Sequence, residues 1–175
     1  MREQRVILKT PRLSFVMWDE GDATLVQQLH STMATTRYLS GNAPWSLEKA
    51  EQRLKGWFEE QARDGTTKYK LLAEDGNFVG RAGLSKFRSE QFELGYSLRE
   101  EAWGKGLATE AAGALADWFF ERRFAQGFIA FTHPENIASQ RVLRKIGMRE
   151  RAPIPINGVL GTAFELTADM RPPMP

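Results

Sequence analysis

Two periodicities of apolar and polar residues run along the chain, and each predicts a different kind of element. Alternation with a period of two, or a short apolar run rich in aromatic and branched residues, is typical of a β-strand. The segments of this type are residues 13–18, 68–74, 77–84, 92–98, 127–132 and 160–166. Asp75-Gly76 lies between the second and third of them and is a strong hairpin signal. We therefore expect an antiparallel pair there.

Apolar residues spaced three or four positions apart predict helices in the remaining segments. The first two predicted helices are capped by Asp22 and by Ser46. A third helix follows the strand at 92–98 after a turn and runs to about Arg123. The fourth covers residues 136–146, and its inward-facing residues are expected to be Ala138, Val142 and Ile146.

The order of these elements predicts a mixed sheet. A strand, a helix and a second strand in succession, as at 92–132, demand a parallel pair with a right-handed crossover. The hairpin signals Asp75-Gly76 and Asn157-Gly158 instead demand antiparallel neighbours. The fold class is therefore α/β with α+β character: a mostly antiparallel twisted sheet flanked by about four helices. We expect one domain over residues 1–170 and a loose, proline-rich tail over 171–175.

Composition narrows the possible functions. The chain of 175 residues is 42% hydrophobic and 26% charged, with a net charge of +2 that does not favour nucleic acid as a partner. The chain contains no cysteine and two histidines, which excludes thiolate chemistry and leaves little for a metal site. No apolar run is long enough to span a membrane, and no secretory signal is present. A cytoplasmic protein without metal is the expectation.

The segment Trp103-Gly104-Lys105-Gly106-Leu107-Ala108 is the strongest functional signal in the chain. Glycines let backbone N–H groups approach an anion closely, and the helix that follows presents unpaired N–H groups and its positive dipole end. Two familiar phosphate motifs do not fit. Arg99 stands where a Walker A loop needs glycine, and Thr109 stands at the third position of the dinucleotide fingerprint. The turn predicts a phosphorylated ligand of another kind, or a glycine turn kept only for steric reasons.

The order of elements and several motifs together resemble the GNAT superfamily of acetyl-CoA-dependent N-acetyltransferases, in particular the branch of ribosomal-protein N-terminal acetyltransferases. The resemblance covers nearly the whole chain, so it is more specific than one glycine turn. The motifs that carry it are Thr10-Pro11-Arg12-Leu13, Gly95-Tyr96-Ser97-Leu98, Trp103-Gly104-Lys105-Gly106-Leu107-Ala108-Thr109-Glu110-Ala111, Pro134-Glu135-Asn136-Ile137-Ala138-Ser139 and Gly147-Met148.

The resemblance implies acetyl-CoA as co-substrate and an amine as acceptor. It places coenzyme A in a slot between two splayed parallel strands, with the pyrophosphate on backbone N–H groups of the glycine turn. Lys105 is either a phosphate partner or a solvated turn lysine. The cofactor-binding residues implied are Tyr96, Ser97, Leu98, Arg99, Trp103, Gly104, Lys105, Gly106, Leu107, Ala108, Thr109 and Asn136.

Acetyl transfer to an amine needs a neutral nucleophile, an oxyanion donor and a proton for the leaving thiolate. The oxyanion donor implied is a backbone N–H near Tyr96. The family often supplies the proton from a tyrosine, but Leu143 occupies that position here, and the resemblance implies Ser139 instead. Ser139 in a first helical turn is equally compatible with a capping role. For the base, Glu93, His133 and water remain open, with Glu93 preferred.

The acceptor is less constrained than the donor. The resemblance implies entry opposite coenzyme A, between the loop at 35–45 and the last hairpin around Asn157, where Arg37, Tyr38 and Trp45 either line the path or pack structurally. Transfer in a ternary complex is the expected function, in a monomer or a homodimer. The alternative is a non-catalytic acyl-CoA-binding module, because binding needs only the turn, whereas catalysis needs the proton-transfer groups.

Overall fold

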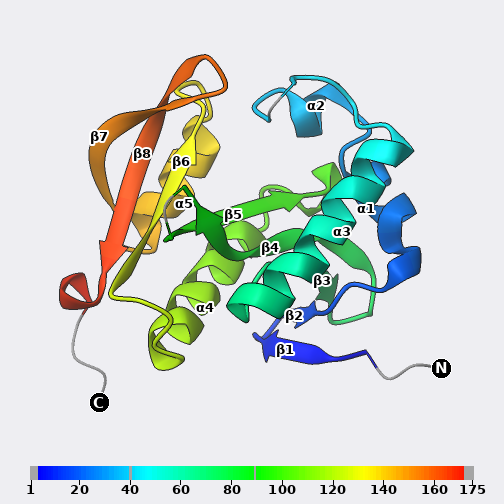
Figure 1. The fold of residues 1–175 in the computed structure, drawn as a ribbon, viewed down its shortest axis with the longest axis horizontal. Helices are drawn as coiled ribbons and strands as arrows, with labels where there is room; N and C mark the ends of the chain where they lie inside the picture. The colour runs from blue at the N-terminus through cyan, green and yellow to red at the C-terminus, as the bar shows by residue number, and fades with distance from the viewer. Residues whose placement is uncertain (1–3, 40, 89, 172–175) are drawn as a thin grey trace.

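An eight-stranded mixed sheet forms the centre of the computed structural model, which describes residues 4–39, 41–88 and 90–171 (Figure 1). All neighbouring strands are antiparallel except one parallel pair, β5 and β6. The strands in sheet order are β1 (Val6–Lys9), β2 (Leu13–Val16), β3 (Lys68–Ala73), β4 (Phe78–Phe87), β5 (Gln91–Leu98), β6 (Gly127–Thr132), β8 (Val159–Thr167) and β7 (Arg149–Ile156).

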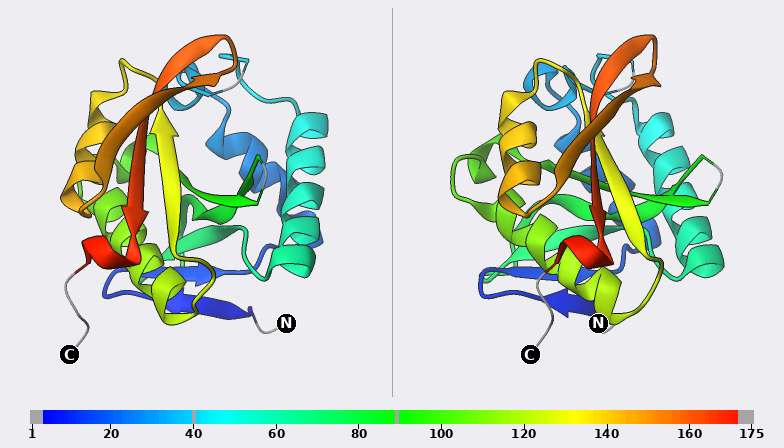
Figure 2. Two further views of the ribbon diagram at one scale, coloured as in Figure 1. Left: turned by 60° about the vertical axis from the view of Figure 1, so that its left-hand side comes forward. Right: turned by 90° about the vertical axis from the view of Figure 1, so that its left-hand side faces the viewer.

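Helices cover both faces of this sheet (Figure 2). On one face α4 packs against β4 and β5, and on the other α1 and α3 pack together over β4. The α-helices are α1 (Ala23–Leu29), α2 (Met33–Thr36), α3 (Leu47–Asp64), α4 (Leu107–Glu121) and α5 (Ile137–Lys145). Three short 3-10 segments lie at Glu20–Asp22, Glu100–Ala102 and Ala168–Met170. Within the described ranges, no helix combines the length and apolar character that crossing a bilayer requires.

The two faces hold separate apolar cores. The larger core fills the space between the sheet and α4, where Phe92 and Phe128 both contact the ring of Phe119 edge-on. The smaller core lies beneath α1 and α3, where Trp18 stacks on Trp57 with ring centroids 5.0 Å apart. Because helices cover both faces of the sheet, each face buries its apolar side chains in a core of its own.

The predicted mixed sheet is confirmed, and so are the predicted strands and longer helices. Ser46 caps α3, since its hydroxyl accepts a hydrogen bond from the N–H of Lys49 at 3.1 Å. The helix count differs by the four-residue α2, which is too short to show a helical period. The hairpin predicted at Asn157-Gly158 is confirmed, and its first strand is β7. No bounds were predicted for β7 because Pro153 and Pro155 interrupt it; such prolines are tolerated at the sheet edge that β7 occupies.

One inward-facing prediction for α5 is wrong. Ala138 is exposed, whereas Gln140 and Leu143 are buried, with Val142 and Ile146 half-buried beside them. The buried face includes a polar residue because the amide of Gln140 donates to the carbonyl of Pro134 at 2.8 Å. A pattern of apolar positions alone cannot locate such a face. Of the tail predicted at 171–175, only Arg171 lies within the described residues, and its guanidinium donates to the carbonyl of Ala116.

Candidate active site

The parallel strands β5 and β6 splay apart, and we call the space between their backbones the slot. Among the described residues, the one position at which these two strands pair is Glu93 opposite Ile129, whereas β5 pairs with β4 over its whole length. Beyond Glu93 the two strands separate, as the diverging arrows of β5 and β6 show in Figure 1. Because strand backbone groups that lack a neighbouring strand remain available to a ligand, the edge of β5 from Tyr96 to Leu98 can bind an extended chain. The splay predicted for the cofactor slot is thus present.

The glycine turn connects the end of β5 to α4 in a left-handed backbone conformation. Gly104 and Gly106 have φ values of +70° and +77°, which residues with side chains rarely adopt. Gly106 is also the residue that precedes α4. The first helical N–H to find a backbone acceptor is that of Glu110, which donates to the carbonyl of Gly106 at 3.0 Å. The N–H groups before it face the end of the helix and suit a phosphate.

A clamp from the N-terminal strands holds this turn, and the sequence-based prediction missed it. The carboxylate of Glu110 accepts hydrogen bonds from the hydroxyl of Thr10 at 2.6 Å and from the Nε of Arg12 at 2.6 Å. The other end of the Arg12 guanidinium donates to the carbonyl of Lys105 at 2.7 Å. Burial alone would raise the pKa of Glu110, but these hydrogen bonds outweigh it and lower that pKa. The turn is therefore fixed before any ligand binds.

A cavity of about 640 Å³ adjoins the turn on its β4 side. Three residues predicted to bind the cofactor, Arg99, Lys105 and Leu107, lie in its wall with Arg12. Glu74, Asp75 and Glu101 also line it, so the cavity is polar but not uniformly positive. Trp103 is 48% exposed, and its indole N–H donates to the carbonyl of Leu98 at 2.9 Å.

Tyr96 and Ser139 join the two sides of the slot. The hydroxyl of Tyr96 on β5 lies 2.8 Å from the hydroxyl of Ser139 on α5, the helix that follows β6. Asn136 caps α5, since its side-chain oxygen accepts from the N–H of Ser139 at 3.2 Å. Burial raises the pKa of Tyr96 to about 12, with the hydrogen bond to Ser139 opposing it in part. The Tyr96 hydroxyl therefore keeps its proton at neutral pH. The Tyr96 hydroxyl was not predicted, because the alternation in β5 does not show which helix residue it meets.

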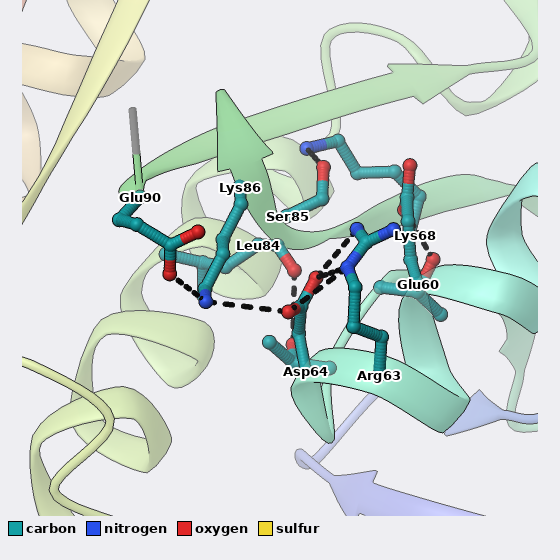
Figure 3. A network of polar contacts seen from close by, with 10 residues as sticks. Glu60, Arg63, Asp64, Lys68, Leu84, Ser85, Lys86 and Glu90 are labelled. Atoms are coloured by element: carbon teal, nitrogen blue, oxygen red, sulfur yellow. Dashed lines mark hydrogen bonds and ion pairs between the residues drawn. The ribbon is translucent and has the colours of Figure 1, made fainter. Parts of the chain in front are cut away.

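Glu93 alternates with Phe92 and Leu94, which pack in the larger core, so it faces the other side of the sheet, where a buried lysine already holds it. The carboxylate of Glu93 lies 2.9 Å from the Nζ of Lys68, which also donates to the hydroxyl of Ser85 at 2.8 Å. Figure 3 shows the Lys68 to Ser85 contact within the polar network of this region. Burial lowers the pKa of Lys68, and the charge of Glu93 counteracts that shift. The two groups neutralise each other on this face.

The second candidate base, His133, lies at the end of β6. Its Nδ1 accepts a hydrogen bond from the N–H of Glu135 at 3.2 Å, and its ring stacks on Tyr38 with centroids 5.2 Å apart. The guanidinium of Arg37 lies 4.9 Å from the same tyrosine ring. Tyr38 thus connects the loop after α2 to the loop after β6. Trp45, in contrast, is buried in the smaller core, and its ring is tilted against that of His30 with centroids 4.0 Å apart.

Comparison with known proteins supports the family suggested by the motifs. The model of the family described as "Acetyltransferase (GNAT) domain" matches residues 12–149. YkkB of Bacillus subtilis strain 168, an uncharacterised protein, is 33% identical over 140 residues, which are 75% of this chain and 78% of YkkB. YnaD of the same strain, an uncharacterised N-acetyltransferase, is 32% identical over 101 residues, and the match spans 57% of this chain but 59% of YnaD.

The fold is shared with solved acetyltransferases. The structure of RimL, a ribosomal alpha-N-protein acetyltransferase in complex with coenzyme A, superposes with a TM-score of 0.80 at 18% identity. The superposition covers 95% of this chain and all of the RimL chain. At this level of identity the similarity is one of fold alone, and it does not indicate that this chain acts on the same acceptor as RimL.

Proposed function

Because the chain belongs to the GNAT acetyltransferase family and is an acetyl-CoA-dependent N-acetyltransferase, we propose that it transfers the acetyl group by direct attack of a primary amine in a ternary complex. The observation that supports this mechanism is the pair of hydroxyls, Tyr96 and Ser139, across the slot. An acyl-enzyme is not required, and the chain has no cysteine to form one with a thiol.

The chemical step needs three groups, of which the chain supplies two. A backbone N–H near Tyr96 donates to the oxyanion that forms when the amine nitrogen attacks the thioester carbon. Ser139 gives its proton to the sulfur as the carbon–sulfur bond breaks, and the hydroxyl of Tyr96 returns a proton to Ser139. The Tyr96 proton is replaced from solvent. Backbone N–H groups from Trp103 to Thr109 hold the pyrophosphate, and Asn136 keeps Ser139 in the first turn of α5.

For the base we propose water rather than Glu93. A carboxylate that takes a proton loses its charge, and Lys68 would then keep a buried ammonium without its counter-ion. His133 is also less suited, because its Nδ1 already accepts from the N–H of Glu135. An amine that arrives neutral passes its extra proton to water after attack. The rate should then follow the ionisation of the amine rather than that of a side chain.

Ligand-dependent stability tests the donor assignment. A ligand that binds only the folded state raises the melting temperature, and the rise grows with its concentration relative to Kd. We expect acetyl-CoA and coenzyme A to raise the melting temperature of this chain, and NAD and ATP at the same concentrations to leave it unchanged. Absence of a response to acetyl-CoA would overturn the proposed donor.

A further inference from the structure

Arg81 is a buried cation without an anionic partner among the described residues. It lies on β4, is 8% exposed, and its only hydrogen bond runs from Nε to the Nε2 of His30 at 3.2 Å. The carboxylates with a charge effect on it are Glu93 and Glu60. Both are engaged elsewhere, since Glu93 pairs with Lys68 and Glu60 accepts from the hydroxyl of Thr67 at 2.7 Å. Burying an unpaired charge is costly, so an arginine in this state calls for an explanation.

Three buried nitrogens on other side chains of this region lack hydrogen-bond partners in the described part of the chain. They are Nδ1 of His30 and the indole nitrogens of Trp45 and Trp57. Burial, followed by the charges of Arg81, Lys49 and Arg53, lowers the pKa of His30 to about 2, so its ring is neutral. Because Nε2 accepts the hydrogen bond from Arg81, the proton of the neutral ring sits on Nδ1. All three nitrogens are therefore hydrogen-bond donors.

These four side chains form one cluster, which we call the donor cluster: His30, Trp45, Trp57 and Arg81. The rings of His30 and Trp45 have centroids 4.0 Å apart, and the guanidinium carbon of Arg81 lies 5.5 Å from the ring of Trp57. Every unsatisfied polar atom in the cluster is a donor. A water molecule cannot satisfy such a set well, because it brings two protons of its own as well as its lone pairs. An anion that only accepts is the complementary ligand.

The donor cluster lies next to the slot, on the face opposite α4. Arg81 pairs directly with Ser97 across β4 and β5, and Ser97 follows Tyr96 in the strand that borders the slot. Trp45 ends the loop at 35–45 that leads to α3. The cluster is thus one strand away from the reacting centre and beside the loop expected to admit the acceptor.

We propose that the donor cluster binds a carboxylate of the acceptor, so that the substrates of this enzyme are amines that carry an acidic group. The inference rests on the proposed function, because it assigns the acceptor of that same reaction. A carboxylate offers two oxygens and about four lone-pair positions, and it accepts the planar guanidinium in a bidentate manner. The carboxylate belongs either to a small amino acid or to an acidic side chain near a peptide N-terminus, and both present the same group to Arg81.

Matched acid and amide acceptors test this inference. One arm uses straight-chain amino acids from glycine to aminohexanoate against their amides, and the other uses C-terminally amidated peptides with Asp or Asn after the N-terminal residue. In one of the two arms, we expect kcat/KM for the acid to exceed kcat/KM for the matching amide by about tenfold or more, which is the size of effect typical of a hydrogen bond to a charged group. Arg81→Gln should remove the preference with little change in the KM for acetyl-CoA. Equal use of acid and amide in both arms overturns the proposal.

Two further variants keep the test informative. Trp45→Phe retains the ring but removes one donor, so it should weaken the preference several-fold even where Arg81→Gln fails to fold. Arg53→Gln removes an exposed cation beside the ring of Trp57 and should change the preference by no more than about twofold. If the preference for the acid over the amide is unchanged in both Arg81→Gln and Trp45→Phe, the proposal is overturned and the donor cluster has a structural role only.

A binding readout separates this proposal from the proposed function. The preferred acid, added without acetyl-CoA, should raise the melting temperature of the wild type more than its amide does, and Arg81→Gln should abolish the difference. If no amine is acetylated but the acid still stabilises only the wild type, the anion site stands and the proposed function fails. If acetyl-CoA binds and amines are acetylated without any effect of the acid group, the anion site fails alone.

Discussion

The hydroxyl oxygens of Tyr96 and Ser139 lie 2.8 Å apart, and this contact connects β5 to α5 across the slot between the parallel strands. Two elements separated by the whole of α4 and β6 thereby place two proton donors together. Buried hydroxyls in one hydrogen-bonded chain can pass a proton without leaving either oxygen charged. In the proposed mechanism this pair takes the role of the tyrosine acid that is common in the family, whose position is occupied here by Leu143, a residue buried in the larger core.

Removal of either hydroxyl should slow turnover more than it weakens cofactor binding. We expect Ser139→Ala to lower kcat by about 100-fold, which is at the lower end of the range for the loss of a general acid. Tyr96→Phe should lower kcat by about tenfold, because Tyr96 acts through Ser139. The KM for acetyl-CoA should change little, because we propose that the glycine turn, and not these hydroxyls, binds the pyrophosphate. Steady-state kinetics measures both values. Ser139→Thr, which keeps the hydroxyl, should retain more activity than Ser139→Ala, and a kcat of Ser139→Ala equal to that of the wild type would remove Ser139 from the mechanism.

The left-handed backbone at Gly106 should be required for donor binding. A Cβ at this position would meet only Arg12 at 3.5 Å, so the cost of Gly106→Ala is conformational, about 1–2 kcal/mol at a φ of +77°. We expect the variant to raise the Kd for acetyl-CoA roughly tenfold, measured by calorimetric titration. Gly113→Ala is the matched control on the same helix, because a Cβ there meets Ile146 at an ordinary 3.8 Å. Equal affinity in both variants would count against the turn as the phosphate site.

The Lys68–Glu93 pair should matter for stability and not for proton transfer. Glu93→Gln leaves a buried ammonium without its counter-ion, so we expect a loss of about 3 kcal/mol in the free energy of unfolding. The double variant Lys68→Met with Glu93→Gln should recover most of that loss. The pH profile of kcat/KM should stay the same in Glu93→Gln. A profile that loses its rising limb in this variant would instead make Glu93 the base.

His30 should make the protein less stable in mild acid. Its pKa is lowered from 6.5 to about 2 by burial and then by nearby cations, so the unfolded chain binds a proton there that the folded chain does not. Above pH 6.5 His30 therefore does not lower the free energy of unfolding, and as the pH drops from 6.5 toward 2 this free energy falls. Between pH 7 and pH 5 the loss should be about 2 kcal/mol. Denaturant titrations of wild type and His30→Gln at both pH values measure it, and equal pH dependence would contradict the assignment.

Local signals in the sequence predict the elements of this fold well. The glycine turn, the Ser46 cap and the Asp75-Gly76 hairpin each depend on residues close together in the chain, and the structure contains all three. The parallel pair at 92–98 and 127–132 was expected because a strand, a helix and a second strand in succession demand one, whereas the slot between these strands was implied by the family resemblance.

The parts that sequence patterns did not predict depend on contacts between distant residues. Glu110 meets Thr10 and Arg12 only because β1 and β2 lie beside the start of α4. The partner of Glu93 is Lys68 because β3, β4 and β5 pair in a particular register, and a shift of one residue would turn each side chain to the opposite face. The donor cluster draws on α1, α3 and β4 in the same way. Side-chain chemistry at such sites follows from strand register rather than from local periodicity.

Acetylation of an amine, followed directly by mass spectrometry, tests the central claim of this account. The purified chain is incubated with acetyl-CoA and a panel of amines that includes acidic amino acids and N-terminal peptides. We predict that one acetyl group appears on the amine for each coenzyme A released. After a short incubation, neither product should be detected with Ser139→Ala in place of the wild type. Binding of acetyl-CoA without an acetylated amine would contradict the claim and would make the chain a non-catalytic acyl-CoA-binding module.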